Sequence, residues 1–211
     1  MGNNSELFFK QSTPANQPTI DSTENAVRFA SANSNYMTSN KMFDWANPFV
    51  FEFWHKFNSI GLVNQYVMSS WNFGTDNNNY FLIRYQYLLR YLDFRVKYGG
   101  VNDTVILENQ ILVNDTDWHH FLVCSNGVYL SEYTDGKIDR IASLPSGAVA
   151  NNFPIQVGLL LGIGHYFDGF LDDLSIKQFC PEHLNAYDGS SAKYSVATNE
   201  EVFTPIPRKT Y

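Results

Sequence analysis

The chain has 211 residues, of which 44% are hydrophobic and 17% charged, and this composition predicts one folded domain with a full core. The net charge is −7, and no cluster of Lys and Arg provides the basic stripe that nucleic acid or an anionic membrane requires, so we expect neither partner. The sequence contains no run of about 18 apolar residues, the length that a membrane-spanning helix needs, so no membrane insertion is expected. The first residues also lack the pattern of a secretory signal.

The amino-terminal half predicts a series of β-strands. Residues 1–25 are polar around one apolar patch and predict an arm or an edge strand, and short strands follow at 26–30 and 36–38. The clearest pattern lies at 49–57, where two sets of residues alternate: Phe49, Phe51, Phe53, His55 and Phe57 with Val50, Glu52, Trp54 and Lys56. Because successive side chains of a strand point to opposite faces, this segment predicts an aromatic face turned toward the core.

Further strands are expected at short intervals. They lie at 65–73, 80–86, 90–98, 105–107 and 111–113, with polar turns between them. Short strands at this spacing are typical of an antiparallel sandwich or barrel.

The stretch from Trp118 to Gly136 predicts two consecutive hairpins. Asn126-Gly127 and Asp135-Gly136 are strong hairpin signals, because a type I′ turn has positive φ at both central residues. A strand at 137–144 pairs back across the second turn, and the last strands are expected at 153–164 and 167–177. Residues 181–187 predict one or two helical turns, and the tail from 188 to 211 is expected to be extended.

Several of these segments together resemble the laminin-G-like, concanavalin A-like jelly-roll family. The segments that carry the resemblance are 26–29, 35–37, 49–56, Trp118-His119-His120-Phe121, Asp135-Gly136, 167–176 and 181–184. Residues 167–176 are similar to the family's closing strand, Phe-x-Gly-x-Ile-Asp-Asp-Val-x-Ile. The resemblance implies an all-β, two-sheet antiparallel jelly-roll sandwich over residues 26–187, with an arm at 1–25 and a tail at 188–211.

The chain lacks the motifs of common catalytic sites. The hydrolases of this family use Glu-x-Asp-x-x-Glu, whereas the nearest approaches here are Glu132 with Asp135 and Asp172 with Asp173. Two adjacent strand residues point to opposite faces, so neither Asp172 with Asp173 nor His119 with His120 is expected to line one site. No Gly-x-Ser-x-Gly or Cys-x-x-Cys occurs. We therefore expect no enzyme.

A structural calcium ion and free thiols are the remaining expectations from single residues. Asp172 and Asp173 resemble positions that hold calcium in some relatives, but Ala30 stands where those relatives often carry an acidic residue. The alternative is that Asp173 caps backbone amides. Cys124 and Cys180 are expected as free thiols, because a chain of this size can build a core without a disulfide.

Carbohydrate recognition would combine aromatic rings with amide and carboxylate groups. The rings considered are Trp54, Tyr66, Trp71, Tyr85 and Tyr91, and the polar groups are Asp76, Asn77, Asn78 and Asn79. The ligand site is predicted at Trp71, Asp76, Asn77, Asn78 and Tyr66. Packing in the core is the competing explanation for each ring.

The function predicted from these observations is a non-catalytic binding or adhesion module. Family members usually act outside cells, and the chain shows no export signal, so a virion surface protein of the capsid-decoration or fibre type is the leading hypothesis. Its expected partners are host carbohydrate, other virion proteins and further copies in a homo-oligomer. The alternative is a secreted or cell-surface lectin domain, and a glycoside hydrolase is the least favoured class.

Overall fold

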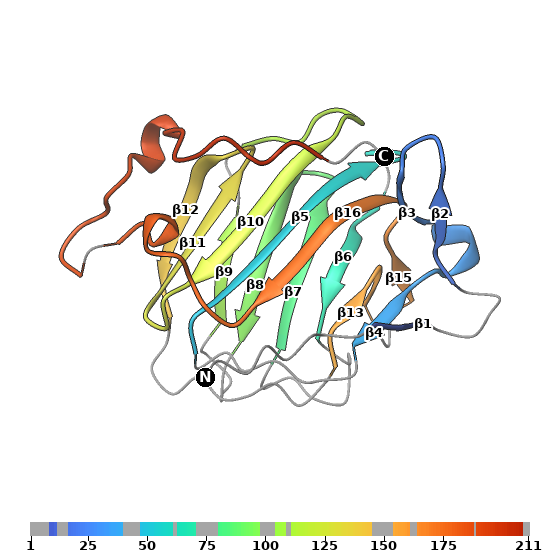
Figure 1. The fold of residues 1–211 in the computed structure, drawn as a ribbon, viewed down its shortest axis with the longest axis horizontal. Coiled ribbons are helices and arrows are strands. Elements are labelled where there is room, and N and C mark those ends of the chain that lie inside the picture. The colour runs from blue at the N-terminus through green and yellow to red at the C-terminus, as the bar shows by residue number, and fades with distance from the viewer. Residues whose placement is uncertain are drawn as a thin grey trace.

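The protein is a sandwich of two antiparallel seven-stranded sheets (Figure 1). The computed structural model describes residues 9–11, 17–39, 47–60, 63–70, 80–97, 104–108, 111–144, 154–160, 164–187 and 189–208. This architecture confirms the predicted all-β two-sheet fold. Within the described residues, no helix is long and apolar enough to span a membrane.

The front sheet is the layer facing the viewer in Figure 1. Its strands, in spatial order, are β12 (Lys137–Ser143), β11 (Tyr129–Thr134), β10 (His119–Ser125), β5 (Phe49–Phe57), β16 (Gly169–Lys177), β3 (Ala26–Phe29) and β2 (Thr19–Asp21). Strands β5 and β16 pair along nearly their full lengths, so segments more than 100 residues apart form the centre of this sheet.

The back sheet forms the second layer. Its order is β1 (Phe9–Gln11), β4 (Met37–Ser39), β13 (Gln156–Val157), β6 (Gln65–Ser69), β7 (Tyr80–Gln86), β8 (Tyr91–Lys97) and β9 (Thr104–Glu108). The small strands β14 (Leu159–Leu160) and β15 (His165–Tyr166) pair separately. The 3-10 turns are η2 (Ser31–Asn33), η3 (Glu182–Leu184) and η4 (Val196–Thr198).

The inner face of β5 forms the centre of the core. Phe49, Phe51, Phe53 and Phe57 are at most 1% exposed, as their alternation predicts. The Phe51 ring stacks on Phe81 of the back sheet with 5.2 Å between ring centroids. Aromatic burial of this kind joins the two layers.

Two turns of the front sheet differ from each other. Asp135 and Gly136 have φ of 51° and 78°, which confirms the predicted turn geometry. Asn126 has no positive φ, so the prediction of a type I′ turn there is wrong. Its Oδ1 instead accepts the Val128 and Tyr129 backbone N–H groups at 2.8 Å, and this side-chain bonding forms a different connection.

Three strand predictions also need correction. Residues 111–113 are not a strand, because the Val113 N–H bonds to Arg90 beside the β7–β8 turn rather than to a ladder. The strand predicted at 65–73 ends at Ser69, and residues 71–73 lie outside the described ranges. The strand predicted at 153–164 is divided at Gly158, whose φ is 86° and whose Cα lies so close to the Phe29 ring that a Cβ would clash.

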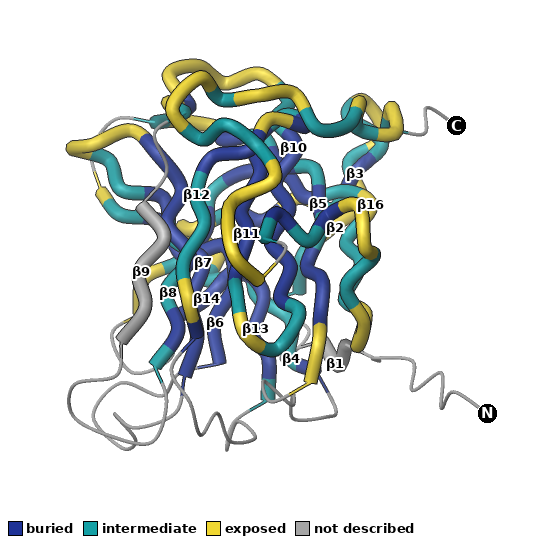
Figure 2. Tube along the Cα trace, turned by 90° about the vertical axis from the view of Figure 1, so that its left-hand side faces the viewer, coloured by how far each residue is buried: buried dark blue, intermediate teal, exposed yellow. Residues whose placement is uncertain are grey.

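The C-terminal segment, residues 178–208 without residue 188, covers part of the outer face of the front sheet (Figure 1, orange to red). Its apolar side chains share a buried cluster with that face: Val50, Leu122, Cys124, Tyr133, Ile138, Leu184, Ala186 and, at the margin, Val202 and Phe203. Both Cys124 and Cys180 are free thiols, as predicted. Figure 2 shows that the end of this segment lies at the top of the molecule, and the segment is mostly half-buried or exposed.

Candidate binding cleft

A cleft of about 570 Å³ opens where the β10–β11 turn meets the C-terminal segment. We call it the β10–β11 cleft. Its lining residues are Asn126, Val128, Tyr129, Glu182, Asn185, Tyr187, Gly189 and Lys193. The volume falls within the range of about 300–1,000 Å³ that is usual for small-molecule sites.

Two tyrosine rings form one wall of the cleft. Tyr129 begins β11, whereas Tyr187 belongs to the C-terminal segment, and their ring centroids are 3.9 Å apart with 30° between the planes. Both residues are half-buried, so the pair is partly open to solvent. Each ring packs against one face of the other, which holds both side chains in place.

Two asparagines connect the same two segments. The Asn126 Nδ2 donates to Asn185 Oδ1 at 3.0 Å, and the Asn185 oxygen also accepts the Tyr187 N–H at 3.4 Å. Asn126 Oδ1 is already engaged by its own turn. The amides are therefore oriented before any ligand binds, which lowers the entropic cost of recognition.

Opposite charges stand at the cleft rim. Glu182 and Lys193 are both exposed and line the opening. The Lys193 backbone N–H bonds to the Ala186 carbonyl at 2.8 Å, which closes the loop that carries Tyr187. Flat rings, amides and a few charges converging on one cleft are the combination that binds saccharides through C–H surfaces and hydroxyl groups.

Of the residues predicted for ligand binding, the structure describes only Tyr66. Trp71, Asp76, Asn77 and Asn78 lie outside the described residues. Tyr66 lies in β6 and is only 6% exposed, in a cluster with Tyr80, Leu82 and Leu160, so its ring faces protein. Of the other rings considered, Tyr85 and Tyr91 are buried, and Trp54 is half-buried on the outer face of the front sheet.

Asp172 and Asp173, the two aspartates considered for calcium, were expected on opposite faces of their strand, but both lie on the same face. A bulge in β16 between Asp172 and Ser175, with Asp173 at φ 48°, turns both side chains to the outer face of the front sheet. Asp172 Oδ2 accepts Arg208 Nε at 3.0 Å, and Asp172 Oδ1 accepts the Asp173 N–H at 2.9 Å. Within the described part of the chain, no group of three His, Cys, Asp or Glu side chains is placed to hold a metal ion, and a calcium ion at Asp172 and Asp173 stays a prediction.

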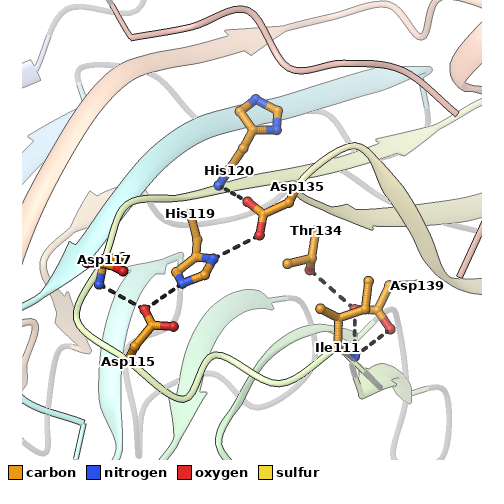
Figure 3. A network of polar contacts seen from close by, with 8 residues as sticks. All are labelled: Ile111, Asp115, Asp117, His119, His120, Thr134, Asp135 and Asp139. Carbon is orange, nitrogen blue, oxygen red and sulfur yellow. Dashed lines mark hydrogen bonds and ion pairs between the residues drawn. The ribbon is translucent and has the colours of Figure 1, made fainter. Parts of the chain in front are cut away.

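The neighbouring histidines face opposite sides of the front sheet, as predicted. The His119 ring lies 5.9 Å from the buried His55 ring on the inner side, whereas the His120 ring lies 5.1 Å from Trp54 on the outer side. Figure 3 shows His119 between Asp135 and Asp115, at 2.8 and 2.9 Å. The hydrogen bond that His119 donates to Asp135, together with the one to Asp115, raises the pKa of His119 to about 9.

This inner-side network is structural. His119 joins the end of β10 to the β11–β12 turn, and Asp135 also accepts the His120 N–H at 2.8 Å (Figure 3). Burial lowers the pKa of His55 to about 3, so His55 is neutral in the fold.

Sequence reasoning did not single out the residues of the β10–β11 cleft. Asn126 and Tyr129 were interpreted as hairpin residues, and Tyr187 as the end of a short helix. The sequence pattern that could have indicated the cleft is a polar turn that ends in Tyr129, together with the later pair Asn185 and Tyr187. Only the folded chain brings these distant segments together.

Comparison with known families identifies the type of domain. The model of the family described as the concanavalin A-like lectin/glucanases superfamily matches residues 21–180. No curated protein sequence matches the chain.

Solved structures share the fold at low sequence identity. The binding domain of Paraclostridial Mosquitocidal Protein 1 is 18% identical, with a TM-score of 0.56, over 85% of this chain and 45% of that one. The binding domain of Botulinum neurotoxin DC, in complex with rat synaptotagmin II, is 12% identical, with a TM-score of 0.64, over 85% of this chain and 45% of that one. The Ruminococcus gnavus IT-sialidase CBM40 bound to alpha2,3 sialyllactose is 10% identical, with a TM-score of 0.51, over 66% of this chain and 80% of that one. The chain therefore spans less than half of each toxin chain.

Proposed function

Since this chain belongs to the concanavalin A-like lectin/glucanases superfamily, we propose that it is a non-catalytic module that binds a saccharide in the β10–β11 cleft. The observation that carries the proposal is the Tyr129–Tyr187 pair, held beside the hydrogen-bonded amides of Asn126 and Asn185. The rings provide a surface for sugar C–H groups, and the amides and rim charges are suited to hydroxyl groups.

The structural relatives support a binding role. The sialidase module holds sialyllactose, and two of the toxin neighbours are described as binding domains. The exposed Lys193 at the cleft rim would favour a saccharide that carries a carboxylate, because the amine and the acid attract each other. Glu182 on the same rim opposes a large negative charge, which favours a single acidic group.

Hydrolysis is the weaker alternative. A glycosidase needs two carboxylates that flank the bond of a bound saccharide. The carboxylates of Glu52 and Asp173 line one cavity, but its volume is about 170 Å³, below the usual range for a small-molecule site. Glu132 is fully buried on the inner side of β11 and cannot reach a substrate.

The test is a glycan array, followed by calorimetric titration of its best ligand. Tyr187→Ala should weaken binding at least tenfold, because it removes one ring of the pair. Tyr166→Ala is the matched control, since Tyr166 is a half-buried tyrosine in β15 that does not line the cleft. Equal affinities of the two variants would place the saccharide outside the cleft, and no binding at millimolar ligand would contradict a saccharide ligand.

The biological setting forms a finer part of the proposal. We place the module on a virion surface, as a decoration or fibre-type subunit in a homo-oligomer, with a secreted or cell-surface lectin as the alternative. The support is that the solved neighbours of this fold are binding modules, as a virion surface subunit that attaches to a host would be. Sedimentation velocity counts the subunits, and antibody labelling of purified particles checks the location. A monomer that no particle carries would contradict this part without affecting the cleft.

A further inference from the structure

A second cavity lies on the outer face of the front sheet, beneath the end of the C-terminal segment. It measures about 170 Å³ and is lined by Glu52, Trp54, His120, Asp173 and Ile206. We propose that this cavity, called here the β5–β16 cavity, binds a primary ammonium group, R–NH₃⁺. The proposal is independent of the saccharide in the β10–β11 cleft.

Three strands deliver the polar groups to one place. Glu52 and Trp54 lie two residues apart on the outer face of β5, and His120 of β10 stands opposite Trp54 in the sheet register. Asp173 comes from the bulge in β16, which sits beside these residues because Asp172 pairs with Trp54 and Ser175 with Glu52. The strands therefore place two carboxylates and an imidazole around one opening.

The bulge is an unusual feature of this site. Asp173 has a φ of 48°, a left-handed conformation that residues other than glycine adopt infrequently. Bulges and such strained residues are concentrated at functional sites, where they redirect a side chain. Without the bulge, Asp172 and Asp173 would point to opposite faces of the sheet, and Asp173 would not line the cavity.

The charges around the cavity leave it negative. Nearby cations are mostly paired, since Arg208 bonds to Asp172 at 3.0 Å and Lys56 bonds to Glu24 at 2.6 Å. The positive charge of Lys177 also lowers the pKa of Glu52. The hydrogen bond from His120 lowers the pKa of the Glu52 carboxyl, so Glu52 is ionised at neutral pH. Two carboxylates therefore line the cavity, and a small cation is the complementary ligand.

The imidazole of His120 borders the same cavity. His120 is 1% exposed, and its Nε2 lies 3.1 Å from Glu52 Oε1. An ammonium group has three N–H donors, and the carboxylate oxygens of Glu52 and Asp173 are acceptors for them.

The indole of Trp54 suits the same ligand. Its Nε1–H donates to the Ile206 carbonyl at 3.1 Å, which fixes the ring against the C-terminal segment. A cation beside the face of an indole ring is attracted by the negative charge density of that face. The small volume fits an ammonium head with a short alkyl chain rather than a whole oligosaccharide.

The test is a titration of the full chain, monitored by NMR at the Trp54 indole N–H. n-Butylammonium is the probe, 1-butanol its neutral counterpart, and tetramethylammonium a cation without N–H donors. Saturable shifts should appear with n-butylammonium, and tetramethylammonium should bind at least fivefold more weakly. Equal responses to n-butylammonium and 1-butanol would overturn the proposal.

Two variants separate the ligand from the fold. Asp173→Asn should weaken n-butylammonium binding at least fivefold while keeping the fold, because asparagine tolerates positive φ. Glu52→Gln should also weaken n-butylammonium binding at least fivefold, because it removes the charge of the other carboxylate. Asp117→Asn is the control, an exposed carboxylate that does not line the cavity. Wild-type affinity in both test variants would contradict the site.

The same chemistry can come from a free amine or from a lysine side chain of a partner. Titration with Nα-acetyl-lysine amide distinguishes these sources. Tighter binding than n-butylammonium indicates contacts with a peptide backbone and a protein partner. Equal or weaker binding indicates a free amine. Failure of saccharide binding in the other cleft leaves these results unchanged, since the two sites share no lining residue.

Discussion

The two faces of β5 are built from different chemistry although they alternate along one nine-residue strand. Its inner face presents phenylalanines that are almost fully buried against the back sheet. Its outer face presents Val50, Glu52, Trp54 and Lys56, which meet the C-terminal segment and neighbouring polar groups. The inner face of β5 therefore packs in the central core, whereas the outer face combines one buried apolar residue with polar side chains beside the C-terminal segment.

The largest expected effect is on the inner face. Phe53→Ala removes a fully buried ring that contacts Phe121 with 5.2 Å between ring centroids. We expect a loss of about 3–5 kcal/mol in the free energy of unfolding, because the substitution leaves a cavity. Urea denaturation measures it, with Glu52→Gln on the outer face as the comparison. Equal losses in the two variants would remove the distinction between the faces.

The inner histidines predict how stability depends on pH. The pKa of His119 is raised to about 9, so its contribution is complete below pH 6.5 and is lost as the pH rises toward 9. The pKa of His55 is lowered to about 3, so stability also falls as the pH drops from 6.5 toward 3. Stability should peak near pH 6.5, with a loss of about 2 kcal/mol by pH 9.

Denaturation at a series of pH values measures this profile. His119→Gln should remove the alkaline decline and leave the acidic one, because Gln cannot carry the charge that Asp135 stabilises. An unchanged alkaline decline in this variant would assign the effect to another group.

The attachment of the C-terminal segment is expected to be weaker than the core. Arg208 bonds to Asp172 and to the Glu24 carbonyl, and its guanidinium lies 3.4 Å from the Trp118 ring centroid. Arg208→Ala should cost roughly 1–2 kcal/mol and increase hydrogen exchange at residues 200–208. Arg208→Lys should retain part of the protection, since lysine keeps the charge but not the planar contacts. Unchanged exchange in the alanine variant would contradict this anchor.

The smallest expected effect lies at the cleft itself. Asn126→Ala removes the bonds to the Val128 and Tyr129 N–H groups and to Asn185, at a cost of roughly 1 kcal/mol. Thermal denaturation measures this loss, and calorimetry measures the accompanying loss of saccharide binding. Asn126→Asp keeps the turn acceptor but cannot donate to Asn185. If it binds as wild type does, the Asn126–Asn185 bond is dispensable.

The sequence alone predicts the inner face better than the outer one. Alternation in residues 49–57 and the Asp135-Gly136 turn are local patterns, and both match the structure. The bulge at Asp173 depends on pairing with β5 and leaves no local signal. The Asn126 turn shows a related difficulty, because a side-chain acceptor replaced the backbone geometry that the Asn-Gly pair favours.

The candidate sites depend on contacts between distant segments. Tyr129 and Tyr187 are 58 residues apart in the chain, and Trp54 meets Ile206 across 152 residues. Neither contact follows from periodicity or from a motif, because the C-terminal segment has no regular pattern. Binding residues assembled in this way become visible only when the chain is folded.

The most direct test of the account is hydrogen exchange with and without a bound saccharide. Protection should appear at residues 126–129 and 182–187, where the β10–β11 turn meets the C-terminal segment. The strands of the back sheet should remain unchanged. Protection confined to β6, β7 and β8, with none at the β10–β11 cleft, would contradict the proposed binding surface.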